Sequence, residues 1–167
     1  MSASLVGSEM CIRDRKISGL FGLHPLPDFL FNTQYSDVDK VYAFNRVMKD
    51  VSMQEKPDVI LLGIPDSLLP LNNKHRFSFG LYAYEIFNAV QPDFVITSLM
   101  ANDGYNDEFY SEISKMAKYK YNVNIDAYFV SQFCPLSNSI WSEKLSYVYL
   151  PQMELPKTEY KVYTTSD

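Results

Sequence analysis

Two Pro-Asp pairs, Pro57-Asp58 and Pro92-Asp93, are each followed by an apolar run of strand length, and these two segments restrict the possible folds more than any other feature. The runs cover residues 59–63 and 94–98, and each is flanked by proline and too short for a buried helix. Continuous apolar character is typical of strands that helices cover on both faces of a parallel sheet. Residues 79–90 between them have the apolar spacing of an amphipathic helix. The sequence therefore predicts a strand–helix–strand unit whose two strands lie side by side and point the same way.

The boundaries of two helices can be predicted from their capping residues. Ser36 should cap a first helix, with Asp39 in the third position and Lys40 on the solvent face, and this helix should end before Pro57. Ser78 should cap the helix over 79–90, which places Phe79 on its inner face.

The remaining segments continue the alternation of helices and strands. We expect an edge strand or an extended lead-in over 17–24 and a helix over 107–118 capped by Asn106 or Asp107. We also expect strands over 124–131, 145–150 and 160–164, of which the last two can form an antiparallel pair. The expected fold class is α/β: a Rossmann-like or flavodoxin-like three-layer sandwich, with a mainly parallel sheet and an antiparallel edge near the C-terminus.

Composition limits the class of protein and its partners. The chain has 167 residues, which suits one domain, and its net charge of −5 makes nucleic acid an unexpected partner. Two distant cysteines, Cys11 and Cys134, form neither a disulfide framework nor a zinc site. The sequence shows no apolar run of membrane-spanning length and no signal peptide, so we expect a cytoplasmic protein with no membrane partner.

Residues 1–14 differ from the rest of the chain because they show no periodicity and no capping residue. They read like a translated sequencing-adapter remnant, a non-native segment that should be kept out of reasoning about the fold. Residues 15–167 are then the expected single α/β domain. If residues 1–14 are such a remnant, this domain is the C-terminal part of a longer protein.

The carboxyl ends of parallel strands are where open α/β sheets bind their ligands. The loop over 64–77 is long for such a connection, and long ordered loops often carry binding residues. The candidate ligand-binding residues at these strand ends are Gly63, Asp66, Ser67, Asn72, Asn73, Asn102, Asp103 and Ser131. The alternative for most of them is a turn role without function, because Asn, Asp and Ser often bond to nearby backbone.

Familiar catalytic motifs give no assignment. The chain has no Gly-x-Gly-x-x-Gly, no Walker A run and no Gly-x-Ser-x-Gly elbow. Asp66, Ser67 and His75 offer a weak catalytic-triad alternative, and no metal or other cofactor is assigned. Whether the protein is an enzyme stays open at this point.

Several motifs together resemble one small family. They are Lys56-Pro-Asp-Val-Ile-Leu-Leu-Gly-Ile-Pro65, Asn72-Asn73, Phe79-Gly-Leu-Tyr-Ala-Tyr-Glu-Ile86, Gln91-Pro-Asp93 and Asn124-Ile-Asp126. This pattern, over residues 56–150, is similar to the peptide maturation system proteins found mainly in clostridia, which are encoded beside radical-SAM peptide-modifying enzymes. The chain departs from the family pattern at Asp66, where a second glycine is expected, and this puts a close backbone contact with a ligand there in doubt.

The resemblance implies an accessory role in the maturation of a ribosomally made peptide. The implied partners are the precursor peptide or the radical-SAM maturase, and the implied activity is binding or scaffolding. The alternative hypothesis is an enzyme that uses a small ligand in a pocket at the carboxyl ends of the parallel strands.

Overall fold

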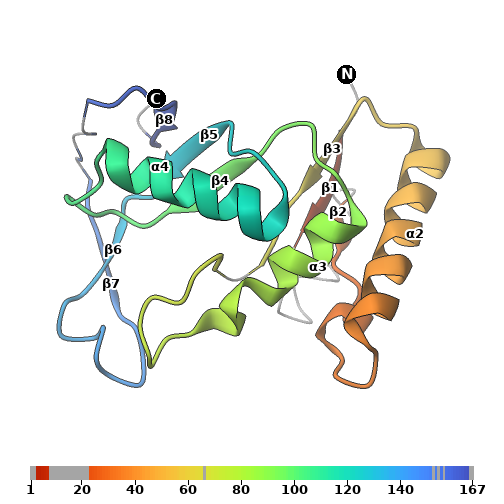
Figure 1. Ribbon diagram of the computed structural model, residues 1–167, viewed down its shortest axis with the longest axis horizontal. Coiled ribbons are helices and arrows are strands. Elements are labelled where there is room, and N and C mark those ends of the chain that lie inside the picture. The colour runs from red at the N-terminus through yellow and green to blue at the C-terminus, as the bar shows by residue number, and fades with distance from the viewer. Residues whose placement is uncertain are drawn as a thin grey trace. The chain divides into compact units, whose positions relative to one another are not determined.

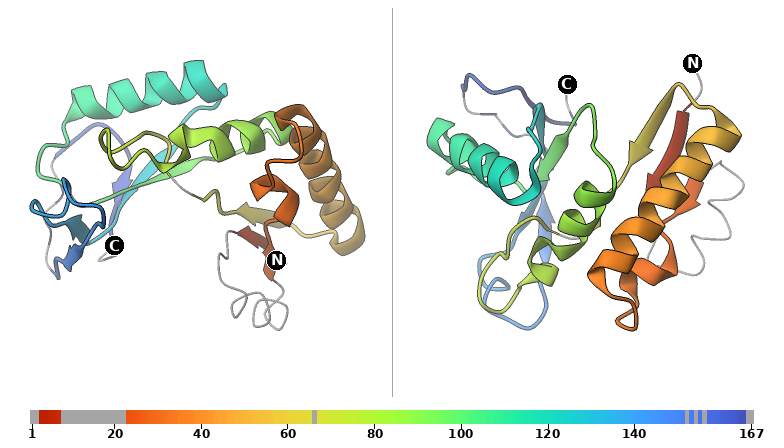
Figure 2. Two further views of the ribbon diagram at one scale, coloured as in Figure 1. Left: turned by 90° about the horizontal axis from the view of Figure 1, so that it is seen from below. Right: turned by 45° about the vertical axis from the view of Figure 1, so that its right-hand side comes forward.

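The chain divides into two compact units, which we describe separately. The computed structural model describes residues 3–7, 23–65, 67–151, 153, 155 and 157–165, with backbone alone for 3–7, 23 and 77. Unit 1 consists of Met1–Pro70 and Phe77–Gln91, and unit 2 consists of Leu71–Arg76 and Pro92–Asp167. Figures 1 and 2 show the elements of both units.

Unit 1 contains a three-stranded parallel sheet in the order β2-β1-β3. Its strands are β1 (Ala3–Gly7), β2 (Leu23–Pro25) and β3 (Val59–Leu62). The central strand, β1, lies within residues 1–14, and the non-native origin of that segment stays a prediction. Most of the edge strand expected over 17–24 lies outside the described residues, and β2 occupies its end.

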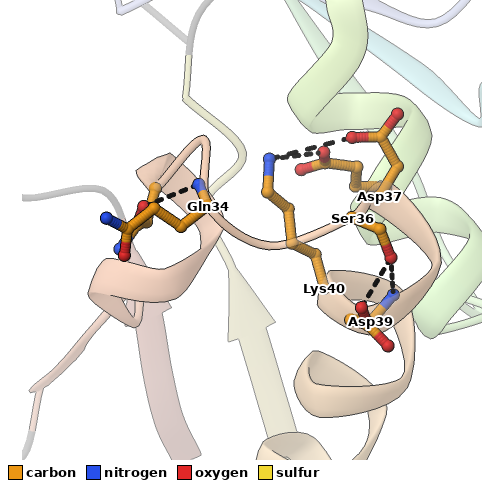
Figure 3. Close-up of polar contacts among 7 residues, drawn as sticks. Gln34, Ser36, Asp37, Asp39 and Lys40 are labelled. Carbon is orange, nitrogen blue, oxygen red and sulfur yellow. Dashed lines mark hydrogen bonds and ion pairs between the residues drawn. The ribbon is translucent and has the colours of Figure 1, made fainter.

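Helix α2 (Asp37–Glu55) begins where its capping residue predicts. The Ser36 hydroxyl oxygen accepts a hydrogen bond from the backbone N of Asp39 (3.2 Å) and donates to the Asp39 carboxylate (2.6 Å), as Figure 3 shows. This reciprocal arrangement satisfies one of the free N–H groups of the first turn. The helix ends with Lys56 in the left-handed conformation, just before Pro57. Both predicted ends are confirmed.

Helix α3 (Leu81–Ala89) begins later than the sequence predicts, after the short helical turn η3 (Phe77–Gly80). Ser78, Phe79 and Gly80 have positive φ angles of 48°, 55° and 74°, so the first helical residue is Leu81 and its N-cap is Gly80. The predictions that Ser78 caps this helix and that Phe79 lies on its inner face are therefore wrong. The side chain of Phe79 is 48% exposed, because the left-handed turn directs it away from the helical face.

The core of unit 1 lies on one face of its sheet. Buried residues from the segment before α2, which includes the 3-10 helix η2 (Asp28–Phe31), from α2 and from α3 form one cluster, and Ile60 and Leu62 of β3 pack against it. The buried members are Leu26, Leu30, Phe44, Met48, Ile86 and Ala89. On the opposite face of β3, Val59 and Leu61 are 43% and 55% exposed. The prediction that this strand is buried on both faces is wrong, because α2 and α3 pack against the same face.

A buried ion pair connects α2 to α3 in unit 1. Lys40 Nζ lies 3.1 Å from Glu85 Oε1, and the two residues are 9% and 4% exposed. Lys40 Nζ also lies 3.9 Å from Asp37 Oδ1, one turn earlier in α2. Figure 3 shows the Lys40 side chain pointing toward the Asp37 carboxylate. The expectation that Lys40 faces solvent is therefore wrong, because its ammonium finds a partner on the neighbouring helix.

Burial gives Glu85 a measurable effect on stability. Burial raises the pKa of its carboxyl above the ordinary value of 4.5, although the Lys40 ammonium acts in the opposite direction. The folded state therefore holds this proton to a higher pH than the unfolded state does. The unfolding free energy should fall as pH rises from 4.5 through the raised pKa and level off above it. Urea titrations across this pH range should show wild type losing stability relative to Glu85→Gln, and parallel profiles would contradict this expectation.

Unit 2 contains a second three-stranded parallel sheet, in the order β4-β5-β8. Its strands are β4 (Ile96–Leu99), β5 (Ala127–Val130) and β8 (Val162–Tyr163). Between β4 and β5 the chain forms α4 (Asp107–Met116) and the π-helical turn η4 (Ala117–Tyr121). Asn106 caps α4 through its side-chain oxygen, which accepts from the backbone N of Phe109 (2.9 Å), and this confirms the predicted cap.

The two strands nearest the C-terminus pair differently from the prediction. β7 (Tyr147–Tyr149) pairs antiparallel with β6 (Phe133–Pro135), and β8 adds in parallel to β5. The antiparallel pair expected between 145–150 and 160–164 is therefore wrong. The antiparallel part of the fold is instead the two-stranded ribbon of β6 and β7, which run side by side in Figure 1.

The two Pro-Asp strands do not share a sheet. β3 pairs with β1 in unit 1, and β4 pairs with β5 in unit 2. The predicted pairing of residues 59–63 with residues 94–98 is not observed: each run pairs with another parallel strand, and the two belong to different three-stranded sheets. The structure is a mixed α/β protein with small parallel sheets of three strands and one antiparallel pair. Among the helices that the structure describes, none combines the length and apolar character needed to cross a bilayer.

Candidate functional site

The exits of β4 and β5 meet at one edge of the unit 2 sheet. Leu99 is in register with Val130 at the ends of the two strands. Just beyond them, the backbone N of Ser131 donates to Leu99 O (2.8 Å), and the backbone N of Ala101 donates to Phe133 O (3.0 Å). For this strand pair, the predicted juxtaposition of carboxyl ends is confirmed.

The candidate residues at this edge are mostly engaged with nearby backbone. The Asn102 side-chain oxygen accepts from the backbone N of Gly104 (2.7 Å), and the Ser131 hydroxyl accepts from the backbone N of Phe133 (3.2 Å). Asp103 lies exposed in the same turn as Gly104. These contacts are the local turn bonds that Asn and Ser form without any ligand.

Asn72 and Asn73 belong to the loop over 71–76, which is also part of unit 2. The Asn72 side-chain oxygen accepts from the backbone N of Lys74 (2.8 Å) and of His75 (2.9 Å), and its amide nitrogen donates to Ile140 O (2.8 Å). Asn73 is exposed, and its carbonyl O accepts from Arg76 Nε (2.9 Å). Asn72 therefore ties its own loop to the loop between β6 and β7.

Replacing Asn72 with alanine should destabilise unit 2, because three hydrogen bonds are lost together. We expect the unfolding free energy to fall by about 1–3 kcal/mol. Urea denaturation followed by the fluorescence of Trp141, the single tryptophan, would measure this loss. Asn73→Ala is the matched control and should stay within about 0.5 kcal/mol of wild type. Equal stability of the two variants would show that the Asn72 contacts contribute nothing.

The other predicted residues belong to unit 1 or lie outside the described residues. Gly63 follows β3 in unit 1, as does Ser67, whose hydroxyl bonds to the backbone N and O of Leu69. Asp66 lies outside the described residues. The eight candidates are thus divided between two units, with Asn72, Asn73, Asn102, Asp103 and Ser131 together in unit 2.

The β6–β7 ribbon begins at this same edge and carries exposed aromatic side chains. Phe133 and Tyr149 face each other with ring centroids 5.5 Å apart, and they are both 53% exposed. Tyr147 is 48% exposed and Val148 40%, while Trp141 in the connecting loop is 68% exposed. We define Phe133, Trp141, Tyr147, Val148 and Tyr149 as the aromatic ribbon surface.

The sequence hypothesis missed this surface, although a signal was present. Residues 145–150 alternate polar and apolar side chains, which indicates a strand with one solvent-facing side. What the alternation could not show is the partner strand, Phe133–Pro135, which lies between the strands expected over 124–131 and 145–150.

One buried side chain, that of Gln132, holds the ribbon where it leaves the sheet. Gln132 is 5% exposed, and its side-chain oxygen accepts a hydrogen bond from the Tyr149 hydroxyl (2.8 Å). Its carbonyl O accepts from the backbone N of Leu150 (2.8 Å). The ribbon is therefore held at the sheet edge by both backbone and side-chain bonds.

A cluster of tyrosines packs beside this edge, and burial keeps the phenol groups of these residues protonated. Tyr105 donates to Met100 O (2.8 Å), and burial, with nearby Tyr110 and Cys134, raises the Tyr105 pKa to about 12. Burial likewise raises the pKa of Tyr110 and of Tyr128. These groups act as packed, protonated side chains at neutral pH and not as bases. Cys134 is a free thiol.

Comparisons with known proteins add no identification: no family model, curated protein or solved structure matches this chain. Within the described ranges, no group of three or more His, Cys, Asp or Glu residues is arranged to hold a metal ion. The fold and the candidate site define a class: a mixed α/β protein. In this protein a ribbon with exposed aromatic side chains begins at the edge of a parallel sheet where the carboxyl ends of the strands lie.

Proposed function

We propose that this chain is an accessory binding module in the maturation of a ribosomally made, modified peptide. Its partner would be the precursor peptide, or the radical-SAM maturase that acts on it, in the cytoplasm. The observation that carries the proposal is the aromatic ribbon surface. Tyr, Trp and Phe are the side chains most enriched at protein interfaces, where they bury large area at low entropic cost.

The contacts of the predicted residues also support binding over catalysis. Asn72, Asn102 and Ser131 use their side-chain oxygens to fix turns around the ribbon. Such bonds hold the loops that frame a surface. We therefore assign these residues to positioning of the ribbon and not to chemistry.

The proposal also includes a specific fold, the Rossmann-like or flavodoxin-like three-layer sandwich expected from the sequence. Unit 1 has the strand order β2-β1-β3, and unit 2 pairs β4 with β5. Each of these orders, taken separately, occurs within the flavodoxin-like order 2-1-3-4-5. We infer a Rossmann-like or flavodoxin-like three-layer relationship, which a crystal structure of the chain would test.

Trp141 offers a direct assay of the proposed binding. Its indole is exposed, while its backbone is fixed by Lys74 Nζ, which donates to Trp141 O (2.7 Å). Titration with the precursor peptide of the proposed maturation system should shift its emission to shorter wavelength. The same complex should form when binding is followed by the anisotropy of a labelled peptide. Absence of binding to both the peptide and the maturase would refute the proposed function.

The alternative is a small-ligand enzyme, and one observation favours it: the exits of β4 and β5 do share an edge. Asp103 is the exposed carboxylate there. If a small ligand binds at this edge, Asp103→Ala should abolish its binding without loss of stability, and an unchanged affinity would remove this alternative.

A further inference from the structure

The pairing of β6 with β7 determines which way the backbone groups of β7 point. The backbone N of Leu150 donates to Gln132 O, and that of Leu136 donates to Ser146 O. In an antiparallel pair, hydrogen-bonded and non-bonded positions alternate. Because Phe133 is opposite Tyr149 and Pro135 opposite Tyr147, these odd-numbered residues occupy the non-bonded positions. The backbone N–H and C=O groups of Tyr147 and Tyr149 therefore point away from β6.

The corresponding edge of β6 is partly used. The carbonyl O of Phe133 accepts from the backbone N of Ala101, and Pro135 has no N–H to offer. Within the described part of the chain, β7 pairs with β6 alone. β7 thus presents an open strand edge, flanked by the exposed side chains of Tyr147, Val148 and Tyr149.

The charge of the ribbon restricts the partner. Residues 133–150 contain two charged side chains, Glu143 and Lys144, whose charges cancel. The Lys74 ammonium keeps its charge, but its contact is with the connecting loop, at Trp141 O. A charged segment placed along this edge would lose hydration without gaining an opposite charge. An uncharged segment would lose little hydration and would cover apolar and aromatic surface of the ribbon.

We propose that β7 binds an uncharged, extended peptide segment by strand addition, with the segment pairing to the backbone of Tyr147 and Tyr149. This inference rests on the proposed function and specifies its partner's chemistry. An extended backbone supplies N–H and C=O groups at the strand spacing, and alternate side chains of the segment contact Tyr147 and Tyr149. Side-chain docking alone would leave the outward groups of β7 bonded to water.

The test uses a defined probe, acetyl-Thr-Val-Thr-Val-Thr-Val-amide, and amide NMR of the isotope-labelled chain. Binding should slow hydrogen exchange at the amides of Tyr147 and Tyr149. N-methylation of alternate probe residues should weaken binding about three- to tenfold, while N-methylation of the intervening residues should not. A peptide with glutamate in place of threonine should bind more weakly than the neutral probe.

Matched variants of the chain provide a second measurement. Tyr147→Ala removes a side chain and keeps the outward N–H, whereas Tyr147→Pro removes both at a position where an edge strand tolerates proline. We expect Tyr147→Pro to bind the probe more weakly than Tyr147→Ala. If proline disturbs the fold, as judged by the amide spectrum, the N-methylation series alone decides.

Three results would overturn the inference. The first is uniform sensitivity to N-methylation or none at all, and the second is equal binding of the glutamate peptide. The third is protection of the Tyr147 and Tyr149 amides in the free chain together with concentration-dependent sedimentation, which would assign the edge to a second copy. In each case, precursor peptide that still shifts Trp141 emission would leave the proposed function standing.

Discussion

Replacing Lys40 with methionine should lower the unfolding free energy of unit 1 by about 3–5 kcal/mol. The reason is that Glu85, which is 4% exposed, would keep a buried carboxylate without its ammonium partner. Its second oxygen, Oε2, is already buried without a hydrogen-bond partner among the described residues. Urea denaturation followed by circular dichroism, with amide exchange of α2 and α3 to locate the loss, would measure the effect.

The double variant Lys40→Met/Glu85→Leu is the decisive control. A buried ion pair replaced by apolar side chains of similar size is often neutral or stabilising, so the double variant should recover most of the loss. Lys49→Met, at an exposed position of the same helix, should stay within about 0.5 kcal/mol of wild type. If Lys40→Met behaves like Lys49→Met, the ion pair is not buried as described.

Replacing Tyr128 with alanine should destabilise unit 2 by about 3–5 kcal/mol. Its ring is 1% exposed and lies against Tyr110 and Tyr160, with ring centroids 4.8 and 6.0 Å away. Its hydroxyl donates to Tyr110 O (3.0 Å) and so accepts from Ser114 Oγ (2.7 Å). The change leaves a cavity between α4 and β5, and Trp141 fluorescence during urea denaturation would report the loss.

Conservative variants separate packing from hydrogen bonding in this cluster. Tyr128→Phe should cost about 1 kcal/mol, because two bonds of the hydroxyl are lost. Tyr110→Phe should be neutral or stabilising, since its buried hydroxyl has no hydrogen-bond partner in the described part of the chain. Tyr119→Ala, at a side chain 88% exposed, should have little effect. The opposite order of the two phenylalanine variants would contradict the bonding described here.

Helix ends could be predicted from sequence where a local side chain determines them. Ser36 and Asn106 each accept a bond from the backbone three residues ahead, so their positions mark helix starts. The start of α3 could not be predicted, because left-handed backbone at Ser78 and Phe79 is uncommon for such residues. Local rules apply where the chain follows its ordinary conformational preferences.

Strand pairing was harder to predict, since a parallel partner can lie anywhere in the chain. Residues 59–63 and 94–98 look alike, yet β3 pairs with β1 and β4 with β5. Apolar composition indicates that a strand exists and not which strand lies beside it. For the same reason, the pairing of β6 with β7 could not be predicted from the sequence.

The sequence predicted the location of the candidate site better than it predicted the residues that form the site. The carboxyl edge of β4 and β5 is where the ribbon begins, as the strand-end rule suggests. Asn72, Asn102 and Ser131 were chosen as polar groups near strand ends, but turn formers have the same composition. The exposed aromatic residues were missed because sequence alone does not separate core from surface aromatics.

Amide hydrogen exchange of the chain with and without its precursor peptide tests the central claim most directly. We expect the peptide to slow exchange at Tyr147 and Tyr149 and to leave β3 of unit 1 unchanged. Slowed exchange confined to residues 59–69, with β7 exchanging as in the free chain, would contradict the claim that the aromatic ribbon surface is the binding site.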